Sequence, residues 1–178
     1  AFYARKDLQK LEKFMEGKPV AEQDIGRQLL KETAAYAESS VCRRKLLLHY
    51  FGEQYHKENC GNCDNCIHPK EQVEAKSYLI KVLEIILATK ENFRDDYIKD
   101  ILKGNKTEEV CAHKHDAIEL FGCGEDTSEQ IWNAVIRQAL ISGYIDKDVD
   151  NYGVLKVTKA GHKFLEKPED FFIVEDKN

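Results

Sequence analysis

The stretch CGNCDNC, residues 60–66, places three cysteines at a spacing that suits a metal ion. Thiolates bind zinc, and a structural zinc site takes four ligands arranged as a tetrahedron. Cys60, Cys63 and Cys66 supply three sulfurs, and Cys42 is the one cysteine that precedes them. Together they give C-x17-C-x2-C-x2-C. This pattern predicts a closed zinc site with Cys42, Cys60, Cys63 and Cys66 as its ligands.

Four sulfur ligands leave no open position for a substrate, so the predicted role of the metal is structural. A catalytic zinc would need one cysteine free and a water in its place, and His49, His56 and His68 are nearby alternative ligands. Each of these histidines is more simply explained as a solvated or core residue. An iron–sulfur cluster also takes four cysteines, and a CxxC redox pair would leave the other two unused. Cys111 and Cys123 have no close cysteine and are expected to pack as small apolar residues.

The polar segment of residues 55–69 has too few apolar residues to form a core, so its order should depend on the metal. Structural zinc contributes about 10–16 kcal/mol in small modules, whereas whole domains are stable by only about 5–15 kcal/mol. A zinc with four thiolates carries a net negative charge that needs donors and cations nearby. The candidates in sequence are Arg43, Arg44, Lys45 and Lys57.

The elements that must position these cysteines follow from the spacing of apolar residues. Helices are predicted at residues 5–16 and 21–52, the second being long enough to form two helices joined near residues 34–40. Further helices are predicted at residues 78–90, at 95–103 with a stop at Gly104, at 129–141 and at 159–167. Asp126, Thr127 and Ser128 are candidate caps of the helix that follows them, with Glu129 and Gln130 placed for a capping box. Residues 105–125 are predicted to form a connecting loop.

A β-hairpin is predicted where YIDKDV and VLKVT flank DNYG. Three helices followed by a hairpin is typical of a winged-helix domain, although other small α+β domains share this order. The predicted fold is therefore mainly α with a small β-hairpin, a helical zinc-binding subdomain followed by a winged helix. The predicted boundaries are residues 1–70, 71–167 and, for a C-terminal tail or linker, 168–178.

Composition and charge exclude some classes of protein. The chain has 178 residues, of which 42% are hydrophobic and 33% charged, with a formal net charge of −5. No apolar run approaches the roughly 18 residues of a membrane span. The net charge argues against coating nucleic acid by bulk electrostatics, but leaves room for a local contact surface. The start without Met or signal pattern predicts a segment of a longer protein, and the cysteine cluster favours a reducing, intracellular compartment.

Two stretches resemble a known family. VCRRKLLLHYFGE followed by CGNCDNC resembles the zinc-binding subdomain of RecQ-family DNA helicases. FGCGED, the helix SEQIWNAVIRQALISGYI and the hairpin ending in VLKVT resemble the RecQ C-terminal winged helix. The resemblance covers most of the chain and implies that residues 1–20 lie at the junction with the second RecA-like motor lobe.

The family's motor couples ATP hydrolysis to 3′ to 5′ unwinding of duplex DNA. This chain lacks a G-x-x-x-x-G-K-[ST] loop, because Gly17-Lys18 has neither the upstream glycine nor the following hydroxyl residue. ATP and Mg²⁺ would therefore belong to motor lobes of the same protein outside this sequence, and the chain alone should be inactive. The resemblance implies that the chain positions double-stranded or forked DNA for repair, recombination or replication, in the bacterial nucleoid or the eukaryotic nucleus.

The residues alone favour a capped helix with a solvated face after Asp126, because Glu125, Asp126 and Glu129 would repel phosphate. With the resemblance, sequence-independent phosphate contacts are expected. The candidates are Thr127, Ser128, Gln130, Asn133, Arg137 and Lys159, with Lys103, Lys106, Lys114 and Lys156 as weaker ones. The resemblance also suggests that Tyr152 wedges against a duplex end, whereas the acidic neighbours Asp148 and Asp150 favour a plain turn tyrosine. The alternatives are a zinc-stapled transcriptional regulator and a protein-interaction module.

Overall fold

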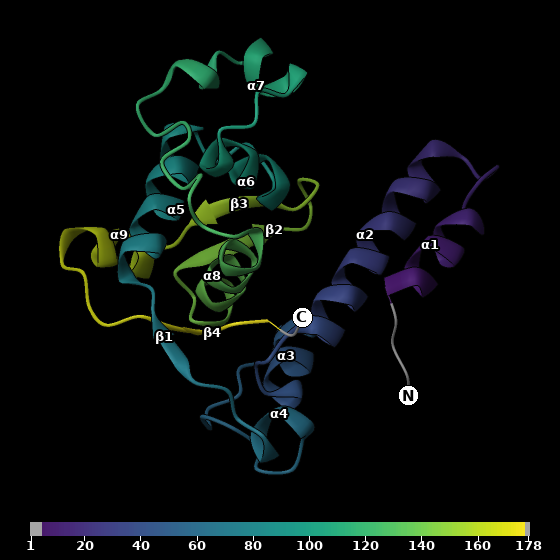
Figure 1. Cartoon of the computed structure of the whole chain (residues 1–178), viewed down its shortest axis with the longest axis vertical. Coiled ribbons are helices and arrows are strands. Elements are labelled where there is room, and N and C mark those ends of the chain that lie inside the picture. Colours follow the sequence, from purple (N-terminus) through teal and green to yellow (C-terminus); the bar gives the residue numbers. More distant parts are fainter. Residues whose placement is uncertain (1–4, 177–178) are drawn as a thin grey trace. The chain divides into compact units, whose positions relative to one another are not determined.

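The computed structural model describes residues 5–176, and the chain divides into two units, with Lys70–Glu175 forming the second. The first unit contains α1 (Arg5–Lys13), α2 (Val20–Glu38), α3 (Arg43–Tyr50) and α4 (Asp64–Ile67) (Figure 1). The long helical pattern therefore forms two helices, and the break falls at residues 39–42.

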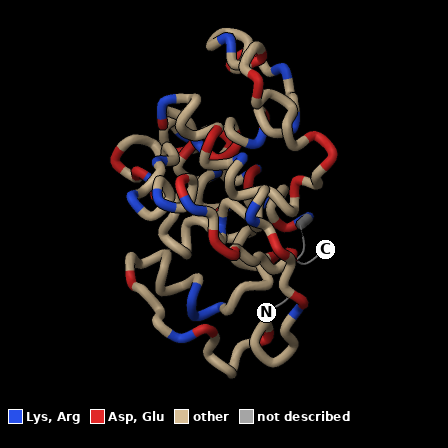
Figure 2. The backbone as a smooth tube through the Cα atoms, turned by 90° about the vertical axis from the view of Figure 1, so that its left-hand side faces the viewer, with Lys and Arg blue, Asp and Glu red and all other residues tan. Residues whose placement is uncertain are grey.

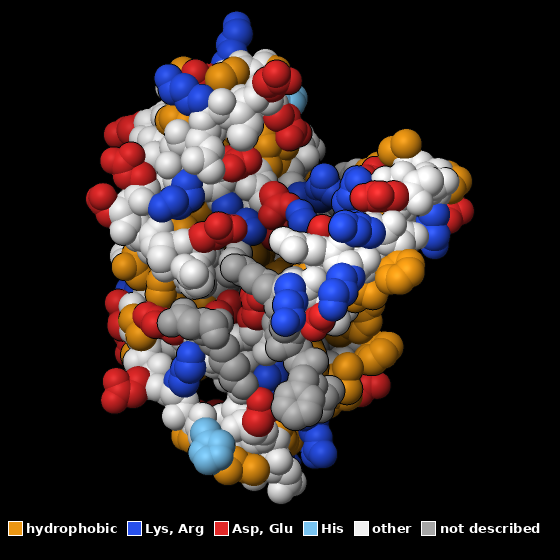
Figure 3. Space-filling model, turned by 45° about the vertical axis from the view of Figure 1, so that its right-hand side comes forward, with side chains coloured by type: hydrophobic (Ala, Val, Ile, Leu, Met, Phe, Trp, Pro, Cys, Tyr) orange, Lys and Arg blue, Asp and Glu red, His pale blue; other side chains and the backbone are white. Residues whose placement is uncertain are grey.

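Burial in the first unit is concentrated around the cysteines. None of the residues of α2 or α3 is fully buried. Among the described residues up to Pro69, the buried side chains are Ser39, Ser40, Cys42 and Asn65. Large apolar side chains such as Phe14 and Phe51 are exposed, and orange patches mark hydrophobic surface in Figure 3. The order of this unit therefore rests on the cysteine cluster more than on an apolar core.

The second unit has the predicted winged-helix order. Its three main helices are α5 (Lys76–Ala88), α6 (Asp95–Lys103) and α8 (Glu129–Ile141), and the hairpin of β2 (Ile145–Asp148) and β3 (Val154–Val157) follows them. The strands are antiparallel, and their register runs from Ile145 opposite Val157 to Asp148 opposite Val154. The structure thus confirms a mainly helical chain with a small hairpin.

The core of this unit forms where α5, α6 and α8 meet, and Trp132 on α8 is fully buried within it. The Trp132 indole Nε1 donates to the carbonyl of Gly124 at 3.2 Å. A Cβ at position 124 would lie 2.2 Å from Cζ2 of this ring, so only glycine fits there. The stretch FGCGED is therefore a close-packed turn against the core.

Two local expectations were wrong. The predicted loop of residues 105–125 contains α7 (Glu108–Ala112) and a 3-10 turn, η1 (His115–Ala117). The Thr107 side chain caps α7 by accepting from the Val110 amide at 3.2 Å. A helix of five residues is too short to show helical periodicity in the sequence. At α8 the cap is Ser128, whose Oγ accepts from the Ile131 amide at 3.4 Å. Because Ile131 occupies the third helical position, no capping box forms with Glu129 or Gln130.

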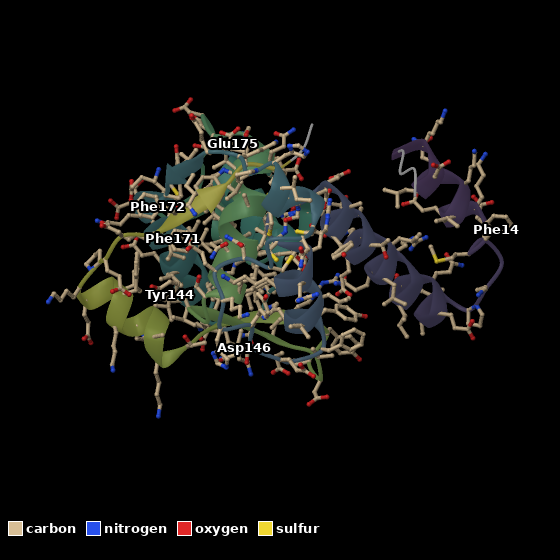
Figure 4. All side chains as sticks on the ribbon, turned by 90° about the horizontal axis from the view of Figure 1, so that it is seen from below. Phe14, Tyr144, Asp146, Phe171, Phe172 and Glu175 are labelled. Atoms are coloured by element: carbon tan, nitrogen blue, oxygen red, sulfur yellow. The ribbon has the colours of Figure 1, made fainter. Side chains whose placement is uncertain are left out.

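The C-terminal segment belongs to the fold. After α9 (Lys159–Glu166), β4 (Phe172–Val174) pairs antiparallel with β1 (Gln72–Glu74). Phe171 is buried, with its ring centroid 5.9 Å from that of Tyr144 (Figure 4). Residues 171–174 are therefore structured and are not part of the tail or linker expected at 168–178. Within residues 5–176, no helix combines the length and apolar character needed to cross a membrane.

Candidate metal centre and nucleic-acid interface

The four predicted cysteines meet at one point. Cys42 precedes α3, Cys63 precedes α4, Cys66 lies within α4, and Cys60 comes from the preceding loop. Their sulfurs all lie within 4.8 Å of one another. The Cys63–Cys66 and Cys60–Cys66 sulfur distances are 3.4 and 3.9 Å. Zn–S bonds of about 2.3 Å in a tetrahedron separate sulfurs by roughly 3.8 Å, so this donor set fits zinc. None of the three nearby histidines belongs to the group.

Backbone amides favour the thiolate form that binds metal. The pKa of the Cys60 thiol is lowered to about 6, chiefly because the Asn62 amide donates to its sulfur. The Arg43 amide donates to the Cys63 sulfur at 3.5 Å. Burial instead raises the pKa of Cys66 to about 11. Gly61, with a φ of +70°, allows the tight loop that brings the Asn62 amide to the Cys60 sulfur, whereas the Arg43 amide comes from the start of α3.

Arg43 joins the helices that carry the cysteines. Its Nε and Nη2 donate to the two carboxylate oxygens of Asp64 at 3.0 Å each. The guanidinium also donates to the carbonyls of Tyr36 and Ala37 and lies 5.1 Å from the centroid of the Tyr36 ring. Arg43 thus connects the end of α2 to the starts of α3 and α4. Of the other predicted cations, Arg44 and Lys57 are exposed.

Asn65 fixes the turn that leads into Cys42. Its buried side-chain amide donates to the carbonyls of Ser39 at 2.9 Å and Val41 at 2.7 Å. Neither Asp64 nor Asn65 was predicted from the sequence. Their position directly between two ligands was the available signal, because short polar side chains there are well placed to organise a metal loop.

Five of the seven candidate DNA contacts lie on α8 or just before it. Ser128 is its N-cap, and the exposed Gln130 follows in the first turn. Thr127 is half-buried, and its carbonyl accepts from Lys103 Nζ at 2.8 Å. Asn133 is also half-buried, and its Oδ1 accepts from Lys99 Nζ at 3.1 Å. The side chain of Asn133 is therefore engaged within the protein.

The other three candidate DNA contacts are Arg137, Tyr152 and Lys159. Arg137 is half-buried, seven positions after Gln130 on α8. Tyr152 lies in the turn between β2 and β3, is 87% exposed and has a φ of +54°. Lys159 is exposed at the first position of α9. The seven candidates thus come from α8, the hairpin tip and α9.

Lysines of α6 counter the acidic start of α8. Lys103 Nζ donates to the Glu125 carbonyl at 2.6 Å, and Lys99 Nζ lies 4.0 Å from the Glu129 carboxylate. Burial alone would lower the pKa of Lys99, but the carboxylates of Asp95 and Asp96 raise it above its usual value. Figure 2 shows basic and acidic residues intermixed along the backbone. Any contact with phosphate is therefore local.

Comparisons with known proteins give a family match for each of the two units. A family model described as RecQ zinc-binding matches residues 5–67, and one described as RQC domain matches residues 69–178. The ATP-dependent DNA helicase RecQ of Pasteurella multocida is 33% identical over 166 residues, covering 92% of this chain and 26% of the relative. The helicase of the same name from Haemophilus influenzae is 29% identical, covering 94% and 27%. The chain thus spans about a quarter of the length of these relatives.

Proposed function

The chain belongs to the RecQ family of helicases, and from that premise we propose that it is the DNA-contacting zinc and winged-helix region of a 3′ to 5′ DNA helicase. The observation that carries this proposal is the convergence of the Cys42, Cys60, Cys63 and Cys66 sulfurs within 4.8 Å of one another in the unit that precedes the winged helix.

In this proposal the four cysteines hold a structural zinc. An all-sulfur site offers no position for substrate, so the ion would supply order and no chemistry. Arg43 and Asn65 add direct hydrogen bonds that join the cysteine-bearing loop to the preceding part of the chain. The proposed zinc subdomain is residues 1–70, and the winged helix begins at residue 71.

DNA would be bound without regard to sequence. The start of α8 presents Thr127, Ser128 and Gln130, and Arg137 and Lys159 add cations; such contacts to phosphate position a duplex without reading its bases. Asn133 supports this surface through its bond to Lys99. Tyr152, exposed at the hairpin tip, would stack on the end of a duplex, where stacking on one base contributes about 1–3 kcal/mol.

The parent protein would supply the motor. The matched relatives are named ATP-dependent DNA helicases and are about four times as long as this chain. We place ATP and Mg²⁺ in motor lobes of the same protein and expect this chain alone not to hydrolyse ATP. Its role would be to hold double-stranded or forked DNA during repair, recombination or replication, in the nucleoid or nucleus.

Fluorescence anisotropy with blunt and forked duplexes of unrelated sequence, at several salt concentrations, tests the proposal. We expect similar affinities for different sequences and a logarithmic salt slope of about −0.9 for each phosphate contacted. Zinc content measured on the same samples should be one ion per chain. A strong sequence preference would support a transcriptional regulator instead, and a failure to bind any duplex would support a protein-interaction module.

A further inference from the structure

The outer edge of the β2–β3 hairpin is closed by the loop between α5 and α6. The amides of Leu155 and Val157 on β3 donate to this loop and not to β2. Leu155 donates to the carbonyl of Phe93 at 2.9 Å, and Val157 donates to the side-chain carboxylate of Glu91 at 2.7 Å. A third strand would satisfy such amides with two backbone carbonyls. Here one carbonyl and one carboxylate do so.

The backbone that presents Glu91 is unusual. Helix α5 ends in a Schellman motif, in which the Lys90 amide donates to Leu87 and the Glu91 amide to Ile86, each at 3.0 Å. Lys90 has a φ of +59° at the position where glycine is common, and Glu91 has a φ of +55°. Successive left-handed residues other than glycine persist only where the surrounding structure requires them. The turn aims the Glu91 side chain at β3.

We propose that Glu91 is a positioning residue for the hairpin and thereby for Tyr152 at its tip. The carboxylate joins β3 to the end of α5, whose residues Ile85 and Ile86 are fully buried in the core. A charged acceptor makes a stronger hydrogen bond than a neutral one. The base of the hairpin is thus fixed to the rigid part of the domain while its tip stays exposed. The consequence for DNA rests on the proposed function, in which the tip meets a duplex end.

The variants Glu91→Ala and Glu91→Gln test this assignment, because the glutamine carbonyl can still accept from Val157. Hydrogen exchange of the Val157 amide, measured by NMR, should be at least about tenfold faster in Glu91→Ala and close to wild type in Glu91→Gln. Glu84→Ala removes an exposed glutamate of α5 and should leave the Val157 exchange unchanged. Lys90→Gly, which relieves a left-handed lysine, should leave it unchanged as well.

The same variants are then compared on a forked duplex carrying 2-aminopurine at the junction. We expect Glu91→Ala to bind the fork but to lose most of the fluorescence change, and Glu91→Gln to restore it. Unchanged Val157 exchange in Glu91→Ala would overturn the anchoring role. Faster exchange with an unchanged fluorescence signal would overturn the positioning role. If the unsubstituted chain fails to bind the fork, the proposed function is overturned, and the Val157 exchange alone decides whether Glu91 fixes the hairpin.

Discussion

The guanidinium of Arg43 donates to both carboxylate oxygens of Asp64, with Nε–Oδ1 and Nη2–Oδ2 distances of 3.0 Å. Arg43 directly follows Cys42, and Asp64 directly follows Cys63. The pair therefore joins the cysteine carried by the helical part of the chain to those of the compact loop. This contact gives the metal centre a second connection that does not pass through a metal ion.

Arg43→Lys should loosen the metal centre. Lysine keeps the charge but cannot form the planar two-point contact with Asp64 or reach the carbonyls of Tyr36 and Ala37 in the same way. Loss of such a supporting contact typically weakens metal binding by about 10- to 100-fold. Competition with a chromogenic zinc chelator measures this. Arg44→Lys, at an exposed neighbouring position, is the matched control, and equal zinc release from both variants would contradict the role given to Arg43.

Cys60→Ser should unfold the cysteine loop while the winged helix stays folded. Zinc binding supplies folding free energy of about 10–16 kcal/mol in small modules, and this unit has few buried apolar residues to replace it. Limited proteolysis with mass spectrometry should then show new cleavage within residues 42–69, together with loss of zinc. Cys111 is exposed and not packed as the sequence suggested, and it lies outside the cluster, so Cys111→Ser should change neither. Unaltered zinc content in Cys60→Ser would refute the ligand set.

The sequence alone predicted the features that depend on apolar periodicity or on the spacing of one residue type. Cysteine spacing identified the metal cluster, and apolar periodicity located α5, α6 and α8. The break between α2 and α3 was predicted only approximately, because both helices carry apolar residues at similar spacing.

Features that depend on distant partners were missed. The pairing of β4 with β1 joins Ile173 to Val73, a hundred positions apart, and three-residue strands carry too little pattern to show it. The engagement of Asn133 by Lys99 likewise depends on the packing of α6 against α8, which helical periodicity does not fix. A side chain that a helical wheel places on the solvent face can therefore form a hydrogen bond with another helix of the same protein.

The hairpin should become less stable in acid. The Lys156 ammonium, 2.7 Å from the Asp148 carboxylate, lowers the pKa of Asp148. Because this pKa is lower in the folded state, the pair contributes stability above the unfolded pKa of aspartate, about 3.9, and this contribution is lost as the pH falls through the folded value. Hydrogen exchange of the hairpin amides between pH 6 and pH 2, corrected for intrinsic rates, measures the loss. Lys156→Met should reduce this pH dependence to the part that the Asn151 and Asp150 amides maintain, and an unchanged dependence would assign the effect to groups other than this pair.

Tyr152→Asn should weaken fork binding without weakening the fold. Asparagine tolerates the left-handed backbone at this position, so the melting temperature should be equal or slightly higher. Loss of the ring should cost about 1–3 kcal/mol of binding if it stacks on the terminal base. Anisotropy with forked DNA measures the affinity. Val149→Asn, at the same exposed tip, is the control, and unchanged affinity in Tyr152→Asn would make this residue a plain turn tyrosine.

Lys103 and Lys159 should differ in how they affect DNA binding. Lys103 Nζ is held by the carbonyls of Glu125 and Thr127 at 2.6 and 2.8 Å, whereas Lys159 is exposed at the start of α9. Lys103→Met should therefore lower the melting temperature and weaken binding at every salt concentration with an unchanged salt slope, because no phosphate contact is lost. Lys159→Met should flatten the slope by about 0.9, the effect of one phosphate, with little change in melting temperature.

Anisotropy titrations over a salt series separate these two outcomes. Lys106→Met, at an exposed position near Lys103, controls for the loss of one positive charge from this part of the chain. A flatter slope in Lys103→Met than in Lys106→Met would show that Lys103 leaves its carbonyl partners to meet phosphate. An unchanged slope with weaker binding means instead that the turn before α8 must be held in place for the DNA contact to form.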